Sequence, residues 1–485
     1  MPDPATERDQ LQGALAVAAQ EAAAYLEGID TEPVHRPGTE AIVNAWSDEL
    51  PEAGDGTMAA ITELARRGAE AATRLSGPRF FHFVMGGGTP AAVAADWLTS
   101  AYDQVALGWA ASPRASRLDQ VATDWLRQLF ELPEEFGGVL VTGATMANFV
   151  GLAAARDWWA SEHGAAVDQD GLAGLPPTPI LTSGYVHVTA VQALGMLGLG
   201  QARVERLSRD PVGRIDLAAL EQRLAQGPAI VIANAGEVNT GDFDPIAEIA
   251  DLIAEHDAWL HVDGAFGLFA RLAPATRHLT EGIERADSIA ADAHKWLNVP
   301  YDCGFAFVRD ARRLATTFAV DAPYLTAPDD PQPNPSFFTP ENSRRARALP
   351  VWATLRAYGR AGHRAMVERH LALAQRLGDR VDAEPDLERL ADVHLNIVCF
   401  RARPAGMHEA QLDDLNRELG ADLLADGRVF AGTTTYADRV AFRPAIVNWR
   451  TTEADVDLLV DVLLELLSRR TGRGSPGPGA PPPAP

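Results

Sequence analysis

The sequence predicts an α/β fold whose large domain is built on a mostly parallel sheet, and two observations support this prediction. Short apolar runs alternate with amphipathic helical stretches between residues 137 and 308, which is typical of βαβ units covered by helices on both faces. In addition, 485 residues with 47% hydrophobic content exceed what a single compact core normally holds. A second, smaller α+β domain is therefore expected.

The first 75 residues predict a helical arm with too little apolar surface to fold alone. An Ala-rich pattern predicts a helix over 10–27, a second helix is expected over 58–75, and Ser76-Gly77-Pro78 ends the arm. The large domain follows, and a helix over 349–358 closes it. Its strands are expected at 137–141, 179–182, 203–207, 229–233, 259–263, 288–291 and 304–308.

The residues after 358 predict a small domain with helices between its strands. Those strands are expected at 395–400, 428–431 and 440–446. The tail from Arg469 is rich in proline and glycine and is expected to be disordered. The expected divisions are a helical arm at 1–75, a large domain at 76–358, a small domain at 359–468 and a tail at 469–485.

Polar residues stand at the ends of three expected strands of the large domain. Thr142 to Thr145 follow the first strand and open a helix expected over 146–159, whose free N–H groups and hydroxyl form a cradle for phosphate. Asp263 ends a later strand, and Lys295 lies just beyond the next one. Ligands of open α/β sheets bind at the carboxyl ends of strands, so these groups are expected to meet.

Lys295 is held at the end of a core element between His294 and Trp296. Desolvation there can lower the pKa of its amine and make it a Schiff-base nucleophile. The ordinary alternative is a lysine whose stem packs on Trp296 and whose ammonium reaches water. Asp263 favours the first interpretation, because pyridoxal 5'-phosphate needs an amine for its aldehyde carbon and a carboxylate for its pyridine nitrogen.

The chain resembles a known family, the pyridoxal-phosphate-dependent group II amino acid decarboxylases, which include the aromatic amino acid, glutamate and histidine decarboxylases. The resemblance extends from about Phe80 to the helix near Leu467 and is densest in four motifs. The pairing of HKW with HVD is specific for this family and not for a substrate. The resemblance implies the fold-type-I transferase-like fold and decarboxylation of an L-amino acid to the amine and CO2 through a Schiff base on Lys295. It also implies a homodimer with shared active sites, across which the arm packs. The motifs are WLHVDGAFG, ADSIAADAHKWLNVPYDCG, GVLVTGATMANFVGL and WAASPRASRLDQVATDWL.

The resemblance implies roles for further residues near the cofactor. His187 is expected to stack on the cofactor ring and to transfer protons, with an imidazole that titrates near pH 6.5, whereas a lone buried histidine is more often a core residue or a cap. Asp292 stands at a position near the phosphate that is often asparagine, and its carboxylate is expected to hydrogen-bond a neighbour. With Lys295 and Asp263, His187 completes the expected catalytic set. The expected cofactor-binding residues are Gly143, Ala144, Thr145, His187, Asp263, Ala265, Asp292, His294 and Lys295.

Substrate contacts are expected near the start of the large domain and in the small domain. Arg443 stands in an apolar strand, either as an edge residue that reaches solvent or, by similarity to the glutamate decarboxylase branch, as a bidentate clamp on the substrate's α-carboxylate. Phe83, Trp109, Phe337 and Phe338 favour an aromatic substrate, although aromatic residues also line ordinary cores. The expected substrate-binding residues are His82, Phe83, Thr89 and Arg443.

Two stretches depart from the family pattern. Glu237 and Val238 stand where many relatives have paired threonines near the cofactor. The segment 324–344 is Pro-rich and is expected to be a mobile loop. In the family a tyrosine of this loop helps to protonate the carbon left after CO2 departs, but here the nearest tyrosine is Tyr324.

Several outcomes of the reaction therefore stay open. The carbanion can be protonated by His187 or by water, or it can react with dioxygen in a decarboxylation-coupled oxidative deamination to an aldehyde. Two further functions stay open as well, a carbon–carbon lyase of the same superfamily and a cofactor-binding protein without turnover.

Composition limits the partners and the compartment. The formal net charge of −24 argues against a nucleic-acid groove or an anionic membrane surface. Cys303 and Cys399 form no disulfide or metal-binding pattern and suit a reducing compartment. No apolar run approaches the roughly 18 residues that span a bilayer, and the N-terminus lacks the pattern of a signal peptide. A cytoplasmic protein without a metal, acting on a small amino acid, is expected.

Overall fold

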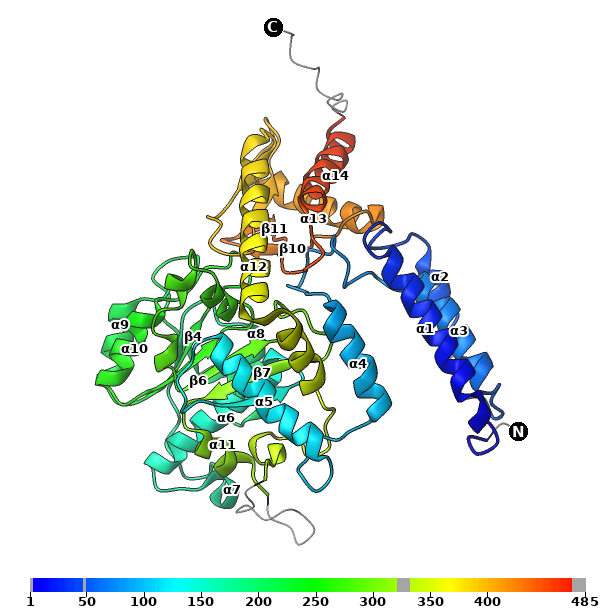
Figure 1. The fold of residues 1–485 in the computed structure, drawn as a ribbon. Helices are drawn as coiled ribbons and strands as arrows, with labels where there is room; N and C mark the ends of the chain where they lie inside the picture. Colours follow the sequence, from blue (N-terminus) through cyan, green and yellow to red (C-terminus); the bar gives the residue numbers. More distant parts are fainter. Residues whose placement is uncertain (1–2, 47–48, 321–331, 473–485) are drawn as a thin grey trace.

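The large sheet of the protein has seven strands in the order β1-β7-β6-β5-β4-β2-β3. The computed structural model describes residues 3–46, 49–320 and 332–472 (Figure 1). β7 runs antiparallel to both of its neighbours, and the other neighbouring strands are parallel, so the predicted mostly parallel sheet is confirmed. The strands are β1 (Gly137–Val141), β2 (Ile180–Thr182), β3 (Val204–Arg206), β4 (Ile230–Asn234), β5 (Trp259–Asp263), β6 (Ser288–Asp292) and β7 (Gly304–Val308).

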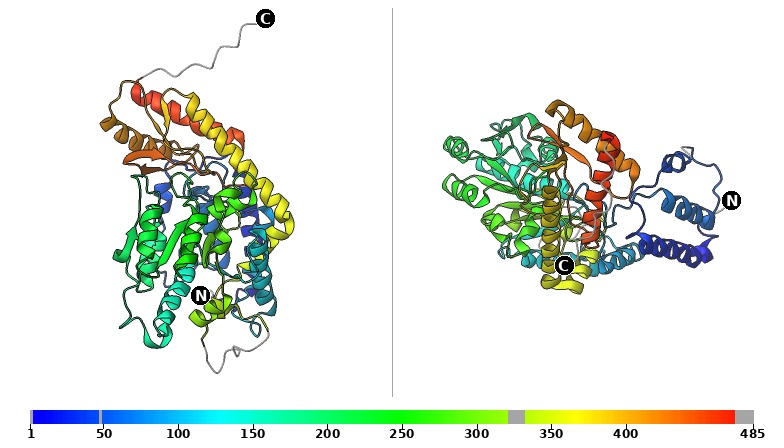
Figure 2. Two further views of the ribbon diagram at one scale, coloured as in Figure 1. Left: turned by 90° about the vertical axis from the view of Figure 1, so that its left-hand side faces the viewer. Right: turned by 90° about the horizontal axis from the view of Figure 1, so that it is seen from above.

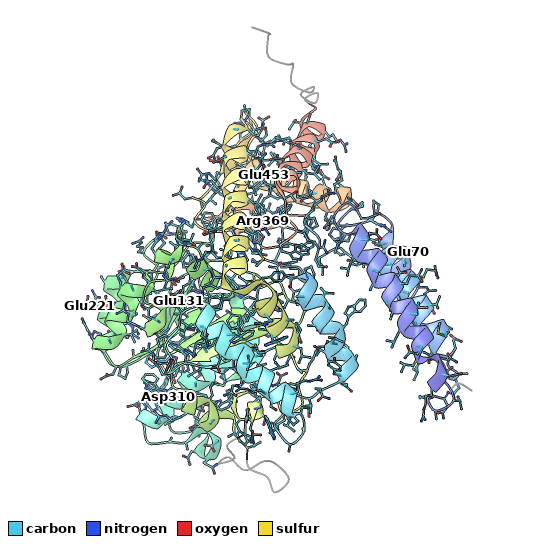
Figure 3. All side chains as sticks on the ribbon, viewed as in Figure 1. Glu70, Glu131, Glu221, Asp310, Arg369 and Glu453 are labelled. Carbon is cyan, nitrogen blue, oxygen red and sulfur yellow. The ribbon has the colours of Figure 1, made fainter. Side chains whose placement is uncertain are left out.

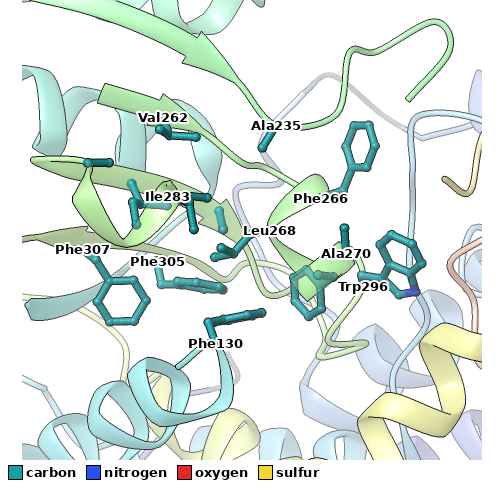
Figure 4. Close-up of a cluster of buried hydrophobic side chains, with 14 of the residues drawn as sticks. Phe130, Ala235, Val262, Phe266, Leu268, Ala270, Ile283, Trp296, Phe305 and Phe307 are labelled. Carbon is teal, nitrogen blue, oxygen red and sulfur yellow. The ribbon is translucent and has the colours of Figure 1, made fainter. Parts of the chain in front are cut away.

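Helices cover the sheet, which explains why its central strands are apolar throughout. Every residue of β4, β5, β6 and β7 is buried, as expected for strands covered on both faces. In the core, the ring of Phe130 stacks on Phe305 at 5.8 Å (Figure 4). The ring of Phe130 also meets Phe269 edge to face at 5.1 Å. The helices of this region are α4 (Pro90–Tyr102), α5 (Pro113–Leu129), α6 (Ala144–Glu162), α7 (Val167–Asp170), α8 (Val188–Met196), α9 (Leu217–Leu224), α10 (Ile246–Glu255) and α11 (Ala311–Phe318).

The N-terminal arm extends away from the body of the molecule (Figures 1 and 2). It consists of α1 (Leu11–Gly28), α2 (Thr39–Val43) and α3 (Thr57–Ala71), and α1 packs on α3. α3 ends four residues before the predicted limit, because Ala72 has an extended backbone. Leu11, Leu15 and Leu64 of the arm are exposed. Charged side chains such as Glu70, Glu221 and Glu453 lie on the outside (Figure 3).

The C-terminal part forms a four-stranded antiparallel sheet in the order β10-β11-β9-β8. Here the predicted strands were mostly wrong. Residues 428–431 form no strand, and only Phe430 makes an isolated bridge with Phe80. The predicted strand over 440–446 ends at Phe442, before Pro444, which has no N–H to donate. The elements are α12 (Ala348–Ala383), β8 (Leu387–Arg389), β9 (Phe400–Ala402), α13 (Glu409–Asp426), β10 (Thr433–Tyr436), β11 (Arg439–Phe442) and α14 (Glu453–Thr471).

The apolar runs that misled the strand prediction are buried loops. Leu395 to Cys399 are buried without belonging to a strand, and only Ile397 pairs with the chain at Ala445. α12 continues across the expected division at 358/359 but is interrupted at Gly359, where φ is 57°. The domain limits therefore stay a prediction. Within the described ranges, no helix is both long and apolar enough to cross a membrane.

Candidate active site

A cavity of about 290 Å³ opens where β4, β5 and β6 end. All nine residues expected to bind the cofactor line it, and so do Phe83 and Arg443. His82 and Thr89 are not part of the lining. The sheet topology explains the convergence, because the carboxyl ends of neighbouring parallel strands share one edge.

Lys295 is the only lysine of the chain, since the other members of its 42 lysines and arginines are all arginines. Its side chain is 19% exposed, and its Nζ lies 3.1 Å from Asp292 Oδ2. Asp292 Oδ1 accepts the Ala144 N–H at 2.5 Å, so this carboxylate connects the amine with the N-terminus of α6. Arginine cannot supply an amine nucleophile, so one retained lysine in an arginine-rich chain is a signal that motif reasoning missed.

A buried hydrogen-bond chain supports the carboxylate of Asp263. Asp263 Oδ2 accepts from Asn148 Nδ2 at 3.0 Å, and Asn148 Oδ1 lies 2.8 Å from His261 Nε2. A carbonyl oxygen only accepts, so His261 carries its proton on Nε2. Its Nδ1 then accepts from the Ser288 hydroxyl at 2.8 Å, and Ser288 Oγ accepts from Trp259 Nε1 at 3.0 Å. Burial lowers the pKa of His261 to about 4, which keeps the ring neutral.

Sequence reasoning missed the members of this chain other than Asp263. Asn148 comes from the first turns of α6, and His261 lies two residues before Asp263 on β5. Glycine at 151 makes room for the imidazole, because a Cβ there would lie 2.7 Å from His261 Cε1. The polar residues in otherwise apolar segments were the signal available.

His187 caps the N-terminus of α8, in agreement with its expected place at the start of a helix. Its Nδ1 accepts the Thr189 N–H at 3.3 Å and lies 2.7 Å from Thr189 Oγ1. Burial lowers the pKa of His187, while the charge of Asp263 opposes this shift. Thr189 also lines the cavity and was not predicted.

His294 stands beside Lys295 at the α6 end of the cavity. Its ring stacks on Tyr301 at 4.2 Å, and its Nδ1 accepts the Cys303 N–H at 3.3 Å. Burial lowers the pKa of His294. The carboxylate of Asp292, whose Oδ1 lies 3.5 Å from His294 Nε2, opposes this shift.

Arg443 is 7% exposed, which excludes the interpretation as an edge residue that reaches solvent. Its Nη1 has no hydrogen-bond partner within the described part of the chain. Burial lowers the pKa of Arg443, and the nearby carboxylate of Glu237 opposes this shift. A buried guanidinium with an unused donor fits a site that receives an anion.

Tyr185 is a further lining residue that sequence reasoning missed. It is buried, and its hydroxyl donates to Asp242 Oδ2 at 2.7 Å. The same oxygen accepts from Arg214 Nε at 3.2 Å. The ring of Tyr185 thus forms a fixed part of the cavity.

Of the three substrate-binding residues predicted in the segment before α4, only Phe83 lines the cavity. Phe83 and Val84 both have φ of 58°, a left-handed conformation that is rare outside glycine, and both line the cavity. His82 is turned away, because its Nδ1 accepts the Gly432 N–H at 3.1 Å. Thr89 caps α4 and lies 2.9 Å from Thr354 Oγ1.

Of the two stretches that depart from the family pattern, the one at Glu237 and Val238 lies beside the cavity. The segment 324–344, expected to be a mobile loop, is described only from residue 332 onward. Val238 lines the cavity, whereas the carboxylate of Glu237 accepts the N–H groups of Asn239 and Thr240. Asn239 Oδ1 in turn accepts from Thr434 Oγ1 at 2.6 Å, which connects this loop to β10.

Three of the four aromatic residues that favoured an aromatic substrate do not line the cavity. Trp109, Phe337 and Phe338 line a separate hollow of about 690 Å³ beside α5. Tyr324 lies outside the described residues.

The lining fits pyridoxal phosphate by the chemistry of its donors. The amine of Lys295 and the carboxylate of Asp263 share one cavity with the N-terminus of α6 and the Thr145 hydroxyl. Glycine at 143 allows the close approach at this helix end, because a Cβ there would lie 3.1 Å from His294 Cε1.

Known proteins are similar to this chain in sequence and in fold. Residues 42–403 match the family model of the pyridoxal-dependent decarboxylase conserved domain. The aromatic-L-amino-acid decarboxylase of Bacillus atrophaeus is 28% identical over 443 residues, which cover 89% of this chain and 90% of that protein. The L-2,4-diaminobutyrate decarboxylase of Rhizobium meliloti (strain 1021) is 32% identical over 431 residues, covering 86% and 83%. A crystal structure of Oryza sativa TDC with PLP and tryptamine matches with a TM-score of 0.86 and 27% identity, covering 95% of this chain and 98% of that one.

Proposed function

This chain belongs to the pyridoxal-dependent decarboxylase family, and from that premise we propose that it converts an aromatic L-amino acid to the corresponding amine and CO2. It is an enzyme that decarboxylates an amino acid with pyridoxal 5'-phosphate as cofactor. When bound, the cofactor supplies an electron sink for the pair that CO2 leaves behind. The observation that carries the proposal is the single lysine of the chain in one cavity with the carboxylate of Asp263.

The cofactor-facing residues have complementary roles in this proposal. Lys295 Nζ holds the aldehyde carbon, and Asp263 keeps the pyridine nitrogen protonated. Asn148 supports that carboxylate with a hydrogen bond at 3.0 Å. Thr145 and the N–H groups at the start of α6 bind the phosphate, because a helix N-terminus favours an anion.

Arg443 is proposed to clamp the α-carboxylate of the substrate. Its buried guanidinium and unpartnered Nη1 support this role. A clamped carboxylate can be held perpendicular to the cofactor ring, which directs the reaction to loss of CO2. His187, which caps α8 and lines the cavity, would pack against the bound cofactor.

An aromatic substrate is supported by the names of relatives and by the lining. The Bacillus atrophaeus relative is an aromatic-L-amino-acid decarboxylase, and the Oryza sativa structure holds tryptamine. In this chain Phe83, Tyr185 and Phe266 line the cavity and offer ring surfaces.

A homodimer with shared active sites is proposed as the working form. The exposed Leu11, Leu15 and Leu64 of the arm support it, because they have no apolar cover within one chain. Sedimentation velocity on the purified protein tests this: a dimer supports the proposal, and a monomer at micromolar concentration refutes it.

A reducing, cytoplasmic location and the division into arm, large domain and small domain are also proposed. The two cysteines, Cys303 and Cys399, are free and buried, which suits a reducing compartment. The separate antiparallel sheet of the C-terminal part supports its division from the large domain.

A screen of the proteinogenic amino acids and 2,4-diaminobutyrate for CO2 release tests the proposed reaction. Aromatic amino acids should give CO2 and amine in equal amounts, and the Lys295→Ala variant should give neither. Release of CO2 only from 2,4-diaminobutyrate would refute the aromatic assignment.

The second candidate product is an aldehyde, formed with consumption of dioxygen and release of ammonia and peroxide. The sequence observation that favours it is the lack of a tyrosine between residues 325 and 344. Measurement of aldehyde and peroxide beside the amine distinguishes the two products.

A further inference from the structure

The contact between Thr189 and His187 determines where the imidazole carries its proton. The backbone N–H of Thr189 points at His187 Nδ1 from 3.3 Å. A backbone N–H can only donate, so Nδ1 must offer its lone pair. The neutral ring therefore carries its proton on Nε2, and the Thr189 hydroxyl at 2.7 Å adds a second contact to the same nitrogen.

We propose that Thr189 is a positioning residue that holds His187 as the Nε2–H tautomer, so that the cavity meets a hydrogen-bond donor and not a base. This inference rests on the proposed function, in which His187 lies against the cofactor. Both residues line the cavity, so the effect reaches the site directly. A second residue that fixes the tautomer and orientation of a histidine is a common device in functional sites.

The groups around His187 agree with a neutral ring. Burial is the largest influence and lowers the pKa of His187. The charges of Asp263 and Asp292 oppose this shift, whereas those of Lys295 and Arg443 add to it. Protonation at Nδ1 would also place a new N–H against the N–H of Thr189, which is unfavourable. The contact with Thr189 and the burial of the ring therefore both disfavour a charged His187.

A neutral His187 has a more limited role in catalysis than a charged one. A ring that is not protonated at Nδ1 cannot serve as an imidazolium acid for the carbon left after CO2 departs. His187 then acts by covering the cofactor and by donating a hydrogen bond from Nε2.

Nitrogen NMR on the cofactor-free protein with ¹⁵N-labelled histidine tests the tautomer without any measurement of activity. The signal of His187 is identified by its loss in His187→Gln. We expect the Nε2–H pattern for the neutral ring. A Nδ1–H pattern would overturn the proposal.

Substitutions at Thr189 test the positioning role. Thr189→Val removes the hydroxyl contact but keeps the backbone N–H, so we expect the Nε2–H tautomer to persist, the His187 signal to shift and broaden as the ring loses its second contact, and kcat to fall by roughly 10- to 100-fold with little change in KM. Thr189→Ser keeps the hydroxyl and should behave as the parent. An unchanged His187 signal in Thr189→Val overturns the proposal.

A matched control separates this effect from general loss of packing. Thr99 in α4 is also buried, and its hydroxyl donates only to the Ala95 carbonyl at 2.8 Å. Thr99→Val should leave the His187 signal unchanged. If Thr189→Val does not fold, the parent spectrum still decides the tautomer. If no amino acid releases CO2, the proposed function fails while the NMR result stands.

Discussion

The two sides of the cavity are built differently. The side that we propose binds the cofactor, the cofactor side, includes Asp263 with Asn148, His261 and Ser288, and each of these polar side chains has a partner from the same chain. The side that we propose binds the substrate, the substrate side, includes Arg443, whose Nη1 has no partner in the described part of the protein. The cofactor side is complete before a ligand arrives, whereas the substrate side depends on an anion to satisfy it.

The difference shows how one scaffold separates two tasks. The carboxylate for the cofactor is fixed by core strands and one helix, so its geometry does not depend on the substrate. The substrate side is assembled from a loop with Phe83 at its exposed end and from the small domain that carries Arg443. Variation there can change the substrate without disturbing the cofactor side.

The largest expected effect follows from removing the amine on the cofactor side. Lys295→Ala should lower CO2 release by roughly 10⁴-fold or more, because no other lysine exists to replace the nucleophile. Borohydride reduction of the cofactor-loaded protein followed by mass measurement provides an independent readout. The parent should gain the mass of one reduced cofactor, and a gain of the same size in Lys295→Ala would contradict the assignment.

The next effect tests the substrate side. Arg443→Met should reduce kcat/KM by roughly 10²- to 10³-fold, because the substrate carboxylate loses a buried charged partner. Arg443→Lys keeps the charge without the planar fork and should recover only part of the loss. Cofactor affinity, measured by absorbance titration, should stay within about threefold of the parent in both variants, and a large loss in either would contradict the separation of the two sides.

A smaller effect is expected within the cofactor side. Asn148→Ala leaves Asp263 Oδ2 and His261 Nε2 without their partner and should weaken cofactor binding by roughly 10- to 100-fold. The free energy of unfolding should also fall by about 1–3 kcal/mol, which urea melts can measure. Asn148→Asp is the contrasting variant, because a second carboxylate beside Asp263 should bind the cofactor still less well. Unchanged affinity in Asn148→Ala would show that Asp263 needs no support.

The smallest effect is expected at Tyr185, which lines the cavity. Tyr185→Phe keeps the ring in the cavity and removes the hydroxyl that donates to Asp242. We expect a loss of about 1 kcal/mol in the free energy of unfolding and a change in kcat/KM below about threefold. A large loss of kcat with unchanged stability would instead give the hydroxyl a direct part in the reaction.

Sequence reasoning predicted the large domain better than the small one for a physical reason. The parallel strands are apolar throughout and end in polar residues, so Asp263 and Lys295 stood out. In the small domain, buried loops have the same apolar composition as strands, and the residues around Val398 were misread. Composition alone does not distinguish the two.

The residues that support Asp263 could not be predicted from local sequence patterns. Asn148 and His261 are 113 residues apart in the chain, and only the folded sheet brings them to 2.8 Å. Thr189 was within reach, because a hydroxyl two residues after a capping histidine can bond back to it. His82 and Thr89 were expected to bind the substrate because of the family resemblance, and that role stays a prediction. In the structure, His82 Nδ1 accepts the Gly432 N–H and Thr89 caps α4.

The solitary lysine has a practical consequence for handling this protein. Reagents that couple to side-chain amines have only one target, and it sits at 19% exposure inside a cavity of about 290 Å³. Apart from the α-amino group of the chain, crosslinkers of that kind should therefore leave the outer surface unmodified, while a small aldehyde that enters the cavity should react with Lys295. An adduct that the parent forms and Lys295→Ala does not form, measured by intact mass, thus counts the loaded sites.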